Sequence, residues 1–166
     1  MKKIGLLSDT HSLLPAEIAN FLKGSDEIWH AGDWGDIKVY NQLKLISPII
    51  KGVYGNIDGP NFSKYLTENL IFNCESVKVL ITHIGGYPGK YQTRIRKIIE
   101  NEKPKLYIAG HSHILKVIYD KKYECLHLNP GAAGNSGFHK VITAMRFDIN
   151  KDKIENLKIF ELPRKD

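Results

Sequence analysis

The sequence predicts a mixed α/β fold with two β-sheets, and three observations lead to this fold class. Short apolar runs alternate with amphipathic runs in the first half of the chain, in the order strand, helix, strand, helix, strand. Two adjacent β-rich runs then predict a hairpin, and five further strand candidates occupy the second half. The alternating order favours a parallel sheet with right-handed crossovers, whereas the hairpin requires antiparallel pairing.

The elements of the first half follow from apolar periodicity. Buried strands are expected where short apolar runs occur, and helices where apolar residues recur on one face, the first of them entered through Pro15. In chain order, these strands and helices are expected at residues 3–7, 16–23, 27–31, 37–46 and 49–54.

The second half changes character after the third strand. Residues 69–74 and 77–82 are β-rich and are separated by Glu75 and Ser76, which predicts a hairpin. Residues 91–102 form an amphipathic helix that Pro104 ends. The remaining strand candidates are residues 106–109, 115–119, 123–128, 141–147 and 154–160.

Length and composition indicate one folded domain, residues 1–166, with no membrane partner. The chain has 166 residues, and its apolar runs are far shorter than the ~20 residues that span a bilayer. Its N-terminal apolar stretch is too short for a signal peptide, so we expect a cytoplasmic protein. Cys74 and Cys125 match no metal-binding spacing and are expected to be reduced structural thiols. The sequence does not predict an oligomeric state.

The net charge of +6 raises the question of nucleic acid binding. Of the 24 basic residues only four are arginines, at positions 94, 96, 146 and 164. Nucleic-acid-binding proteins contact phosphates and bases largely through the bidentate hydrogen bonds of arginine, whereas scattered lysines are typical of a solvated surface. A nucleic acid partner is therefore compatible with the composition but is not favoured.

Seven polar residues stand at the ends of predicted strands. They are Asp9, His11, Asp33, Asn56, His83, His111 and His113. Residues two apart in an extended segment point the same way, so Asp9 with His11, and His111 with His113, can each address one point. A set of carboxylate, amide and imidazole groups without a thiol suits Mn²⁺, Fe²⁺, Co²⁺, Ni²⁺ or Zn²⁺ and argues against a structural zinc site.

The order of these groups resembles the calcineurin-like metallophosphoesterase superfamily. The motifs are Asp-x-His at residue 9, Gly-Asp-x-x-Asp at 32, Gly-Asn-x-Asp at 55, a single His at 83 and Gly-His-x-His at 110. The chain is most similar to the small, single-domain bacterial and archaeal phosphodiesterases of that family. The resemblance implies a four-layer sandwich, with two mixed sheets face to face, helices outside and two metals at one end.

The resemblance also implies which residues hold each ion. One metal would be held by Asp9, His11, Asp33 and His113, and the other by Asp33, Asn56, His83 and His111. Asp33 would bridge ions ~3.5–4 Å apart, the spacing of two-metal hydrolytic sites. We expect Mn²⁺, with Ni²⁺, Co²⁺, Fe²⁺ or Zn²⁺ as alternatives.

The implied activity is hydrolysis of a small-molecule phosphate ester by a phosphodiesterase or phosphatase. A hydroxide between the two metals would attack phosphorus, and we assign catalytic roles to Asp33, Asn56 and His83. The alternative is a non-catalytic protein-binding scaffold of the same fold, because the family also contains the small retromer subunit. Here all seven ligand positions carry competent side chains, which favours an enzyme.

One position departs from the pattern of the larger family members. The residue after Gly55-Asn56 is often a histidine near the leaving group, and here it is Ile57. Isoleucine cannot donate a proton, so the sequence predicts slower turnover or a preference for good leaving groups.

Several other polar residues have two interpretations. Asp36 either caps the helix at 37–46 or supports a liganding histidine, and the cap is favoured. Asp58 is divided between a supporting role and a turn. His30 is expected to be a packed strand residue, and His127 and His139 flank a glycine-rich loop, residues 129–137, that the family places near the metals. A second such loop spans residues 84–89.

Overall fold

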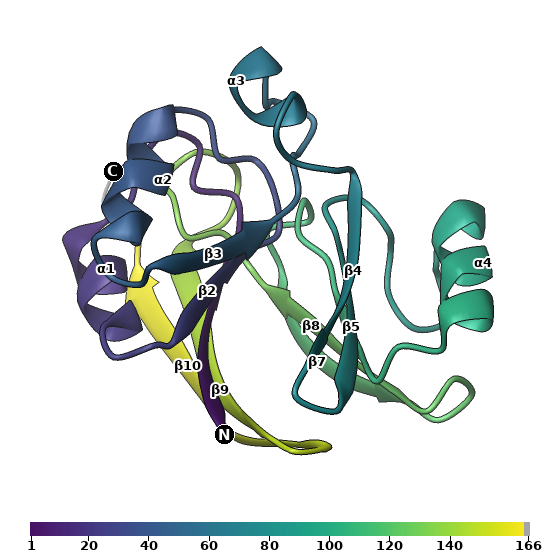
Figure 1. Ribbon diagram of the computed structural model, residues 1–166. Coiled ribbons are helices and arrows are strands. Elements are labelled where there is room, and N and C mark those ends of the chain that lie inside the picture. The colour runs from purple at the N-terminus through teal and green to yellow at the C-terminus, as the bar shows by residue number, and fades with distance from the viewer. Residues whose placement is uncertain (165–166) are drawn as a thin grey trace.

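Two β-sheets pack face to face with helices on their outer sides (Figure 1). The structure, a computed structural model, describes residues 1–164. Each sheet has five strands within these residues. The first sheet has the order β10-β9-β1-β2-β3, with bounds Lys153–Pro163, Val141–Asn150, Lys2–Leu7, Glu27–His30 and Ile49–Gly52. The second has the order β4-β5-β6-β8-β7, with bounds Asn69–Cys74, Val77–Thr82, Leu106–Ile108, Cys125–Pro130 and Leu115–Asp120.

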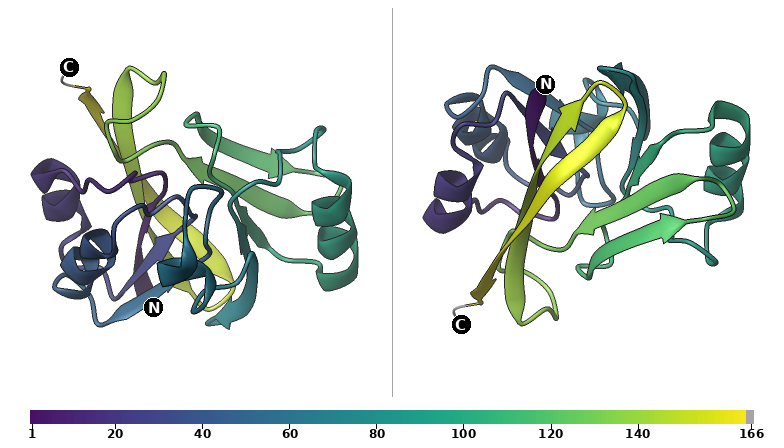
Figure 2. Two further views of the ribbon diagram at one scale, coloured as in Figure 1. Left: turned by 90° about the horizontal axis from the view of Figure 1, so that it is seen from above. Right: turned by 90° about the horizontal axis from the view of Figure 1, so that it is seen from below.

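The helices complete the four predicted layers. Helices α1 (Ala16–Leu22) and α2 (Ile37–Lys44) cover the outer face of the first sheet, and α4 (Thr93–Glu102) covers the outer face of the second (Figure 2). The short α3 (Pro60–Ser63) follows β3 beyond the sheets. The predicted mixed α/β sandwich is confirmed.

Strand alternation decides which side chains fill which layer. Along β1, Ile4 and Leu6 face the second sheet, whereas Leu7 faces the helices. Between the sheets, the Trp29 ring meets Phe72 and Phe147 edge-on, at centroid distances of 5.0 and 5.8 Å. Because successive side chains of a strand point to opposite faces, each sheet closes one core toward its partner and another toward its helices.

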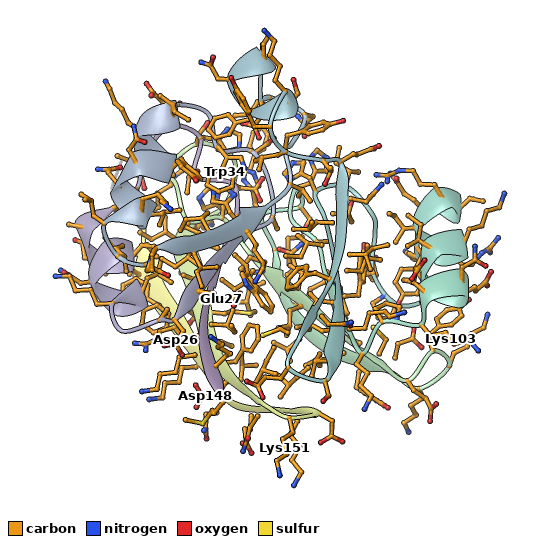
Figure 3. All side chains as sticks on the ribbon, viewed as in Figure 1. Asp26, Glu27, Trp34, Lys103, Asp148 and Lys151 are labelled. Atoms are coloured by element: carbon orange, nitrogen blue, oxygen red, sulfur yellow. The ribbon has the colours of Figure 1, made fainter. Side chains whose placement is uncertain are left out.

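A charged pair lies at the edge of the central core. The buried Glu27 accepts a hydrogen bond from Trp29 Nε1 at 2.9 Å and pairs with the ammonium of Lys51 (Figure 3). That ammonium also lies 4.9 Å from the centre of the Phe72 ring. The carboxylate is therefore doubly satisfied, as a buried charge must be.

The topology agrees with the predicted pairings, while several boundaries differ. Strands β1, β2 and β3 pair in parallel, and β4 and β5 form the predicted hairpin. The strand expected at 123–128 begins only at Cys125, because a turn that ends on Glu124 with φ +49° precedes it. The helix expected from residue 91 begins at Thr93, and α3 was not predicted. Within residues 1–164, no helix is sufficiently long and apolar to cross a membrane.

Candidate metal centre

The loops after five strands meet at one end of the sandwich. These strands are β1, β2, β3, β5 and β6. Asp9 N donates to the carbonyl of Gly32 at 3.0 Å, and Gly110 N donates to that of His83 at 3.0 Å. Across the two sheets, His111 N donates to Asp9 Oδ2 at 3.0 Å. The carboxyl ends of parallel strands are where α/β proteins place ligands, and here both sheets contribute.

The first group of candidate ligands consists of Asp9, His11 and His113. Their ligand atoms lie within 4.8 Å of one another. His113 Nε2 is 3.2 Å from Asp9 Oδ1, and His11 Nε2 is 3.8 Å from the same oxygen. Within residues 1–164, Asp9 Oδ1 and His11 Nε2 are buried and make no hydrogen bond. Buried acceptors without donors are costly, so these atoms fit a cation.

The second group consists of Asp33, His83 and His111, with Asn56 beside them. The ligand atoms of the first three residues also lie within 4.8 Å of one another. His83 Nε2 is 3.2 Å from Asp33 Oδ1 and 3.0 Å from Asn56 Oδ1. All seven residues predicted from the sequence are therefore brought together at one end of the fold.

Asp33 lies between the two groups. Its Oδ2 is 3.4 Å from His11 Nε2 in the first group, whereas its Oδ1 faces His83 Nε2 in the second. The backbone N–H of Ile57 donates to Oδ1 at 3.1 Å and fixes the carboxylate plane. A carboxylate with one oxygen toward each of two clusters has the disposition of a bridging ligand.

A backbone carbonyl on the other sheet sets the orientation of His83. The Nδ1 of His83 lies 2.8 Å from the carbonyl oxygen of Ala31, which can only accept, so Nδ1 carries a proton. Nε2 then faces two oxygen acceptors, those of Asp33 and Asn56. His83 Nε2 and these two oxygens repel one another unless a shared proton or a cation lies between them.

The site residues adopt an uncommon backbone conformation. Five of the seven have positive φ, namely Asp9 (52°), His11 (45°), Asp33 (58°), His111 (66°) and His113 (58°). The left-handed region is unfavourable for residues with a Cβ, and such residues concentrate at functional sites. The strands end sharply here, and the side chains turn back toward the centre.

Glycines leave space for the candidate ligands. A Cβ on Gly32 would lie 2.6 Å from His83 Nδ1, and this glycine has φ +97°. A Cβ on Gly55 would overlap the Asp33 carboxylate. Substitution at either position would therefore displace a candidate ligand.

The charges of the site depend on one another. Burial raises the pKa of Asp9, but the imidazoles of His11 and His113 lower it more, so the pKa lies well below its usual value. The pKa of Asp33 is also lowered, since His83 outweighs the effect of burial. Asp9 in turn raises the pKa of His11. Both carboxylates are therefore ionised at neutral pH, and they attract positive charge to the centre.

The residues around the ligands support their loops. Asp58, whose role the sequence left open, accepts from Gly35 N at 2.9 Å with Oδ1 and from Gly55 N at 2.7 Å with Oδ2, joining the loops that carry Asp33 and Asn56. Trp34, labelled in Figure 3, is fully buried and donates from Nε1 to the carbonyl of Val53 at 2.8 Å.

Asp36 and His30 follow their favoured interpretations. Asp36 caps α2 by accepting from Lys38 N at 2.9 Å. His30 is fully buried and stacks on Trp34 with ring centres 3.7 Å apart, and burial lowers its pKa to about 3. His30 is therefore a neutral packed residue.

The sequence interpretation missed the Ala31 carbonyl and the contact made by His139. A backbone oxygen leaves no signal in residue types. His139, which the sequence places beside the glycine-rich loop 129–137, reaches His113, with the two Nδ1 atoms 3.1 Å apart. His127 is buried on the second sheet, where burial lowers its pKa to about 4. Ile57 is 45% exposed beside Asn56.

Comparison with known proteins gives relatives of both sequence and fold. A phosphodiesterase of Methanocaldococcus jannaschii, MJ0936, is 26% identical over an alignment of 145 residues, and the match covers 78% of this chain and 82% of the relative. The solution structure of Thermotoga maritima protein TM1076 is 26% identical and covers 98% of this chain and 100% of that chain, with a TM-score of 0.73.

A structural neighbour from a eukaryote shares the fold at lower identity. The crystal structure of wild-type Vps29 from Entamoeba histolytica complexed with Zn²⁺ has a TM-score of 0.77 and 17% identity, and covers 98% of this chain and 99% of that chain. The calcineurin-like phosphoesterase superfamily domain matches residues 1–152. The chain therefore belongs to the calcineurin-like phosphoesterase superfamily.

Proposed function

We propose that this protein is a metal-dependent phosphodiesterase that holds two divalent cations at one end of its two sheets. The observation that carries the proposal is the position of Asp33, with one carboxylate oxygen toward each ligand group. The two groups together offer the seven side chains expected from the sequence, with Asp33 shared. The 26% identical phosphodiesterase supports the diester as substrate class.

The donor set supports a first-row divalent metal, and we propose Mn²⁺. Imidazole nitrogens combined with carboxylate and amide oxygens accept Mn²⁺, and Ni²⁺, Co²⁺, Fe²⁺ or Zn²⁺ remain alternatives. When bound, two such ions acidify water and neutralise the charge of a phosphate. Asp9, His11 and His113 would hold one ion, and Asn56, His83 and His111 would hold the other.

Other groups of the protein orient the candidate ligands. The Ala31 carbonyl fixes the ring of His83, and the Ile57 N–H fixes the carboxylate of Asp33, so both ligands are oriented before substrate arrives. The exposed Ile57 side chain offers no proton to a departing alkoxide. This favours esters whose leaving groups are stable as anions, such as aryl or nucleotidyl groups.

The other sequence expectations remain part of the proposal. We propose that residues 1–166 form a single domain that acts in the cytoplasm. The substrate is a small phosphate ester rather than nucleic acid, because lysines supply most of the positive charge.

The test compares two aspartates that lie three residues apart. Asp33→Asn removes charge from the shared ligand, whereas Asp36→Asn retains a capping side chain outside the site. Each protein is stripped with a chelator and loaded with Mn²⁺, and bound metal and hydrolysis of bis(p-nitrophenyl) phosphate are measured. We expect the wild type and Asp36→Asn to bind two ions and hydrolyse the ester. Asp33→Asn should lose at least one ion and about 100-fold or more of the rate.

The same measurements can contradict the proposal. A wild-type protein that retains no metal, or that is no faster than Asp33→Asn, is not this enzyme. That result would favour the alternative, a protein-binding scaffold with the same fold.

A further inference from the structure

A large cavity adjoins the candidate metal centre, and one residue of each ligand group lines it. Its volume is about 820 Å³, and two candidate ligands, His111 and His113, form part of its wall. This volume falls within the ~300–1,000 Å³ range of small-molecule sites. A phosphate held by the metals would therefore stand at the edge of a space that can receive one of its ester groups.

Three exposed apolar side chains from different segments line this cavity. Phe138 is fully exposed at 105%, Ile114 is 57% exposed and Val141 is 38% exposed. Single exposed apolar residues are ordinary, but a group of them around one cavity marks a binding surface. Lys140 and Glu161 add one charge of each sign to the lining, so the cavity wall does not select strongly for charge.

We propose that this cavity binds the non-leaving ester group of the substrate, and that this group is an aromatic ring or a nucleobase stacked on Phe138. The inference rests on the proposed function, since it assigns this cavity to one of the two ester groups of the diester substrate. An exposed phenyl ring offers a flat apolar face at low entropic cost, and base stacking on such a ring tolerates any base.

Three diesters with the same leaving group test this assignment. All release p-nitrophenol, and they differ only in a methyl, phenyl or thymidine 5′ group on the other ester oxygen. Phe138→Ala should lower kcat/KM for the phenyl and thymidine esters about tenfold relative to the methyl ester. Phe138→Tyr should restore the ratio. The control is Tyr65→Ala, which removes an 83% exposed ring that does not line the cavity.

The outcomes separate this inference from the proposed function. An active wild type with the same ratio in Phe138→Ala overturns the aromatic subsite and leaves the phosphodiesterase intact. A wild type that hydrolyses none of the three esters overturns both. Calorimetry gives a second readout, the affinity of the Mn²⁺-loaded protein for phenylphosphonate and for methylphosphonate. Phe138→Ala should lower the affinity for phenylphosphonate and leave that for methylphosphonate unchanged.

A separate chain of hydrogen bonds carries a second inference, about His139. His139 Nε2 lies 2.8 Å from the carbonyl oxygen of Gly134, so this nitrogen donates. In a neutral ring His139 Nδ1 is then an acceptor, and it lies 3.1 Å from His113 Nδ1. This contact favours a proton on His113 Nδ1, which leaves Nε2, 3.2 Å from Asp9 Oδ1, free to ligate a cation.

The chain is anchored to the same ligand group at its other end. Gly134 N donates to the backbone carbonyl of Asp9 at 3.1 Å. The residue whose carbonyl orients His139 is thus held by Asp9, the residue that His113 must face. We infer that His139 is a positioning residue that selects the Nε2-ligating tautomer of His113, a role usually filled by a carboxylate or a carbonyl.

The tautomer can be measured directly in the metal-free protein. Long-range ¹H–¹⁵N correlation of His113 should show a larger fraction of rings protonated at Nδ1 in the wild type than in His139→Phe, in which Asp9 alone acts on the ring and favours a proton on Nε2. Mn²⁺ affinity of the first ligand group should fall about 10-fold to 100-fold in that variant. His139→Asn, which retains an acceptor oxygen near the position of Nδ1, should recover part of both signals.

A merely structural role for His139 predicts a different pattern. His139→Phe would then destabilise the protein while the tautomer of His113 and the ratio of the two metal affinities stay as in the wild type. That pattern, or equal loss in the Asn and Phe variants, overturns the inference.

Discussion

His83 Nδ1 lies 2.8 Å from the carbonyl oxygen of Ala31, and this contact joins a candidate ligand on the second sheet to the backbone of the first. The ring is therefore oriented by the packing of the two sheets. A change that separates this pair should disturb the second ligand group while leaving both sheets formed.

Gly32→Ala makes such a change. The added methyl would lie 2.6 Å from His83 Nδ1, and the residue has φ +97°, so the ring must move. We expect at least a tenfold loss of Mn²⁺ affinity at the second group, measured by calorimetry. Gly59→Ala is the control, because its Cβ would meet nothing within 4 Å. Equal affinities in the two variants would contradict this account of His83.

Ile57→His should broaden the range of leaving groups. The Ile57 side chain is 45% exposed, and only its backbone N–H contacts Asp33, so the substitution can preserve the ligand geometry. An imidazole there can donate a proton to a departing alkoxide. The rate for an alkyl phosphodiester relative to a nitrophenyl one should rise about tenfold or more, and Ile57→Phe should leave it unchanged. An unchanged ratio in Ile57→His would show that this position does not face the leaving group.

Glu27 should contribute to stability through two partners. Glu27→Ala leaves Trp29 Nε1 without its acceptor and Lys51 without its counter-ion, so the free energy of unfolding should fall by about 3 kcal/mol. Glu27→Gln still offers an oxygen to Trp29 and should cost clearly less. Urea denaturation measures both, with Asp152→Ala on the surface as control. Equal losses in the two Glu27 variants would mean that the Trp29 hydrogen bond adds nothing.

His127 should make the protein acid-sensitive. Burial lowers its pKa to about 4, whereas the unfolded chain has an ordinary value near 6.5, so only the unfolded state gains a proton between these values. Stability from this group is present above pH 6.5 and is lost as pH falls toward 4. Relative to His127→Phe, the wild type should lose on the order of 2 kcal/mol between pH 7 and pH 5. Parallel pH profiles of the two proteins would exclude this role.

The candidate ligands could be located in the sequence because their positions are local properties. Asp9, Asp33 and His83 each follow a strand that periodicity identifies. Parallel pairing brings the ends of β1 and β2 together in one sheet and those of β5 and β6 together in the other. The cap at Asp36 was predictable for the same reason, since a cap depends on its own helix.

What escaped prediction depends on approach between distant segments. The Ala31 carbonyl contacts a residue 52 positions away, and Asp58 joins two loops through their N–H groups. His139 meets His113 only because the loop before β9 folds back on the site. The start of β8 was predicted two residues too early, because the preceding turn extends to Glu124, which has a left-handed conformation.

The left-handed backbone of the candidate ligands has an evolutionary consequence. Each such residue costs about 1 kcal/mol that a glycine would not, so the site opposes the stability of the scaffold that carries it. A change to glycine at one of these positions would therefore remove a candidate ligand and relieve backbone strain at the same time. A lineage that did not need the candidate ligands would lose them before it lost the sandwich, which would leave a stable fold for another function.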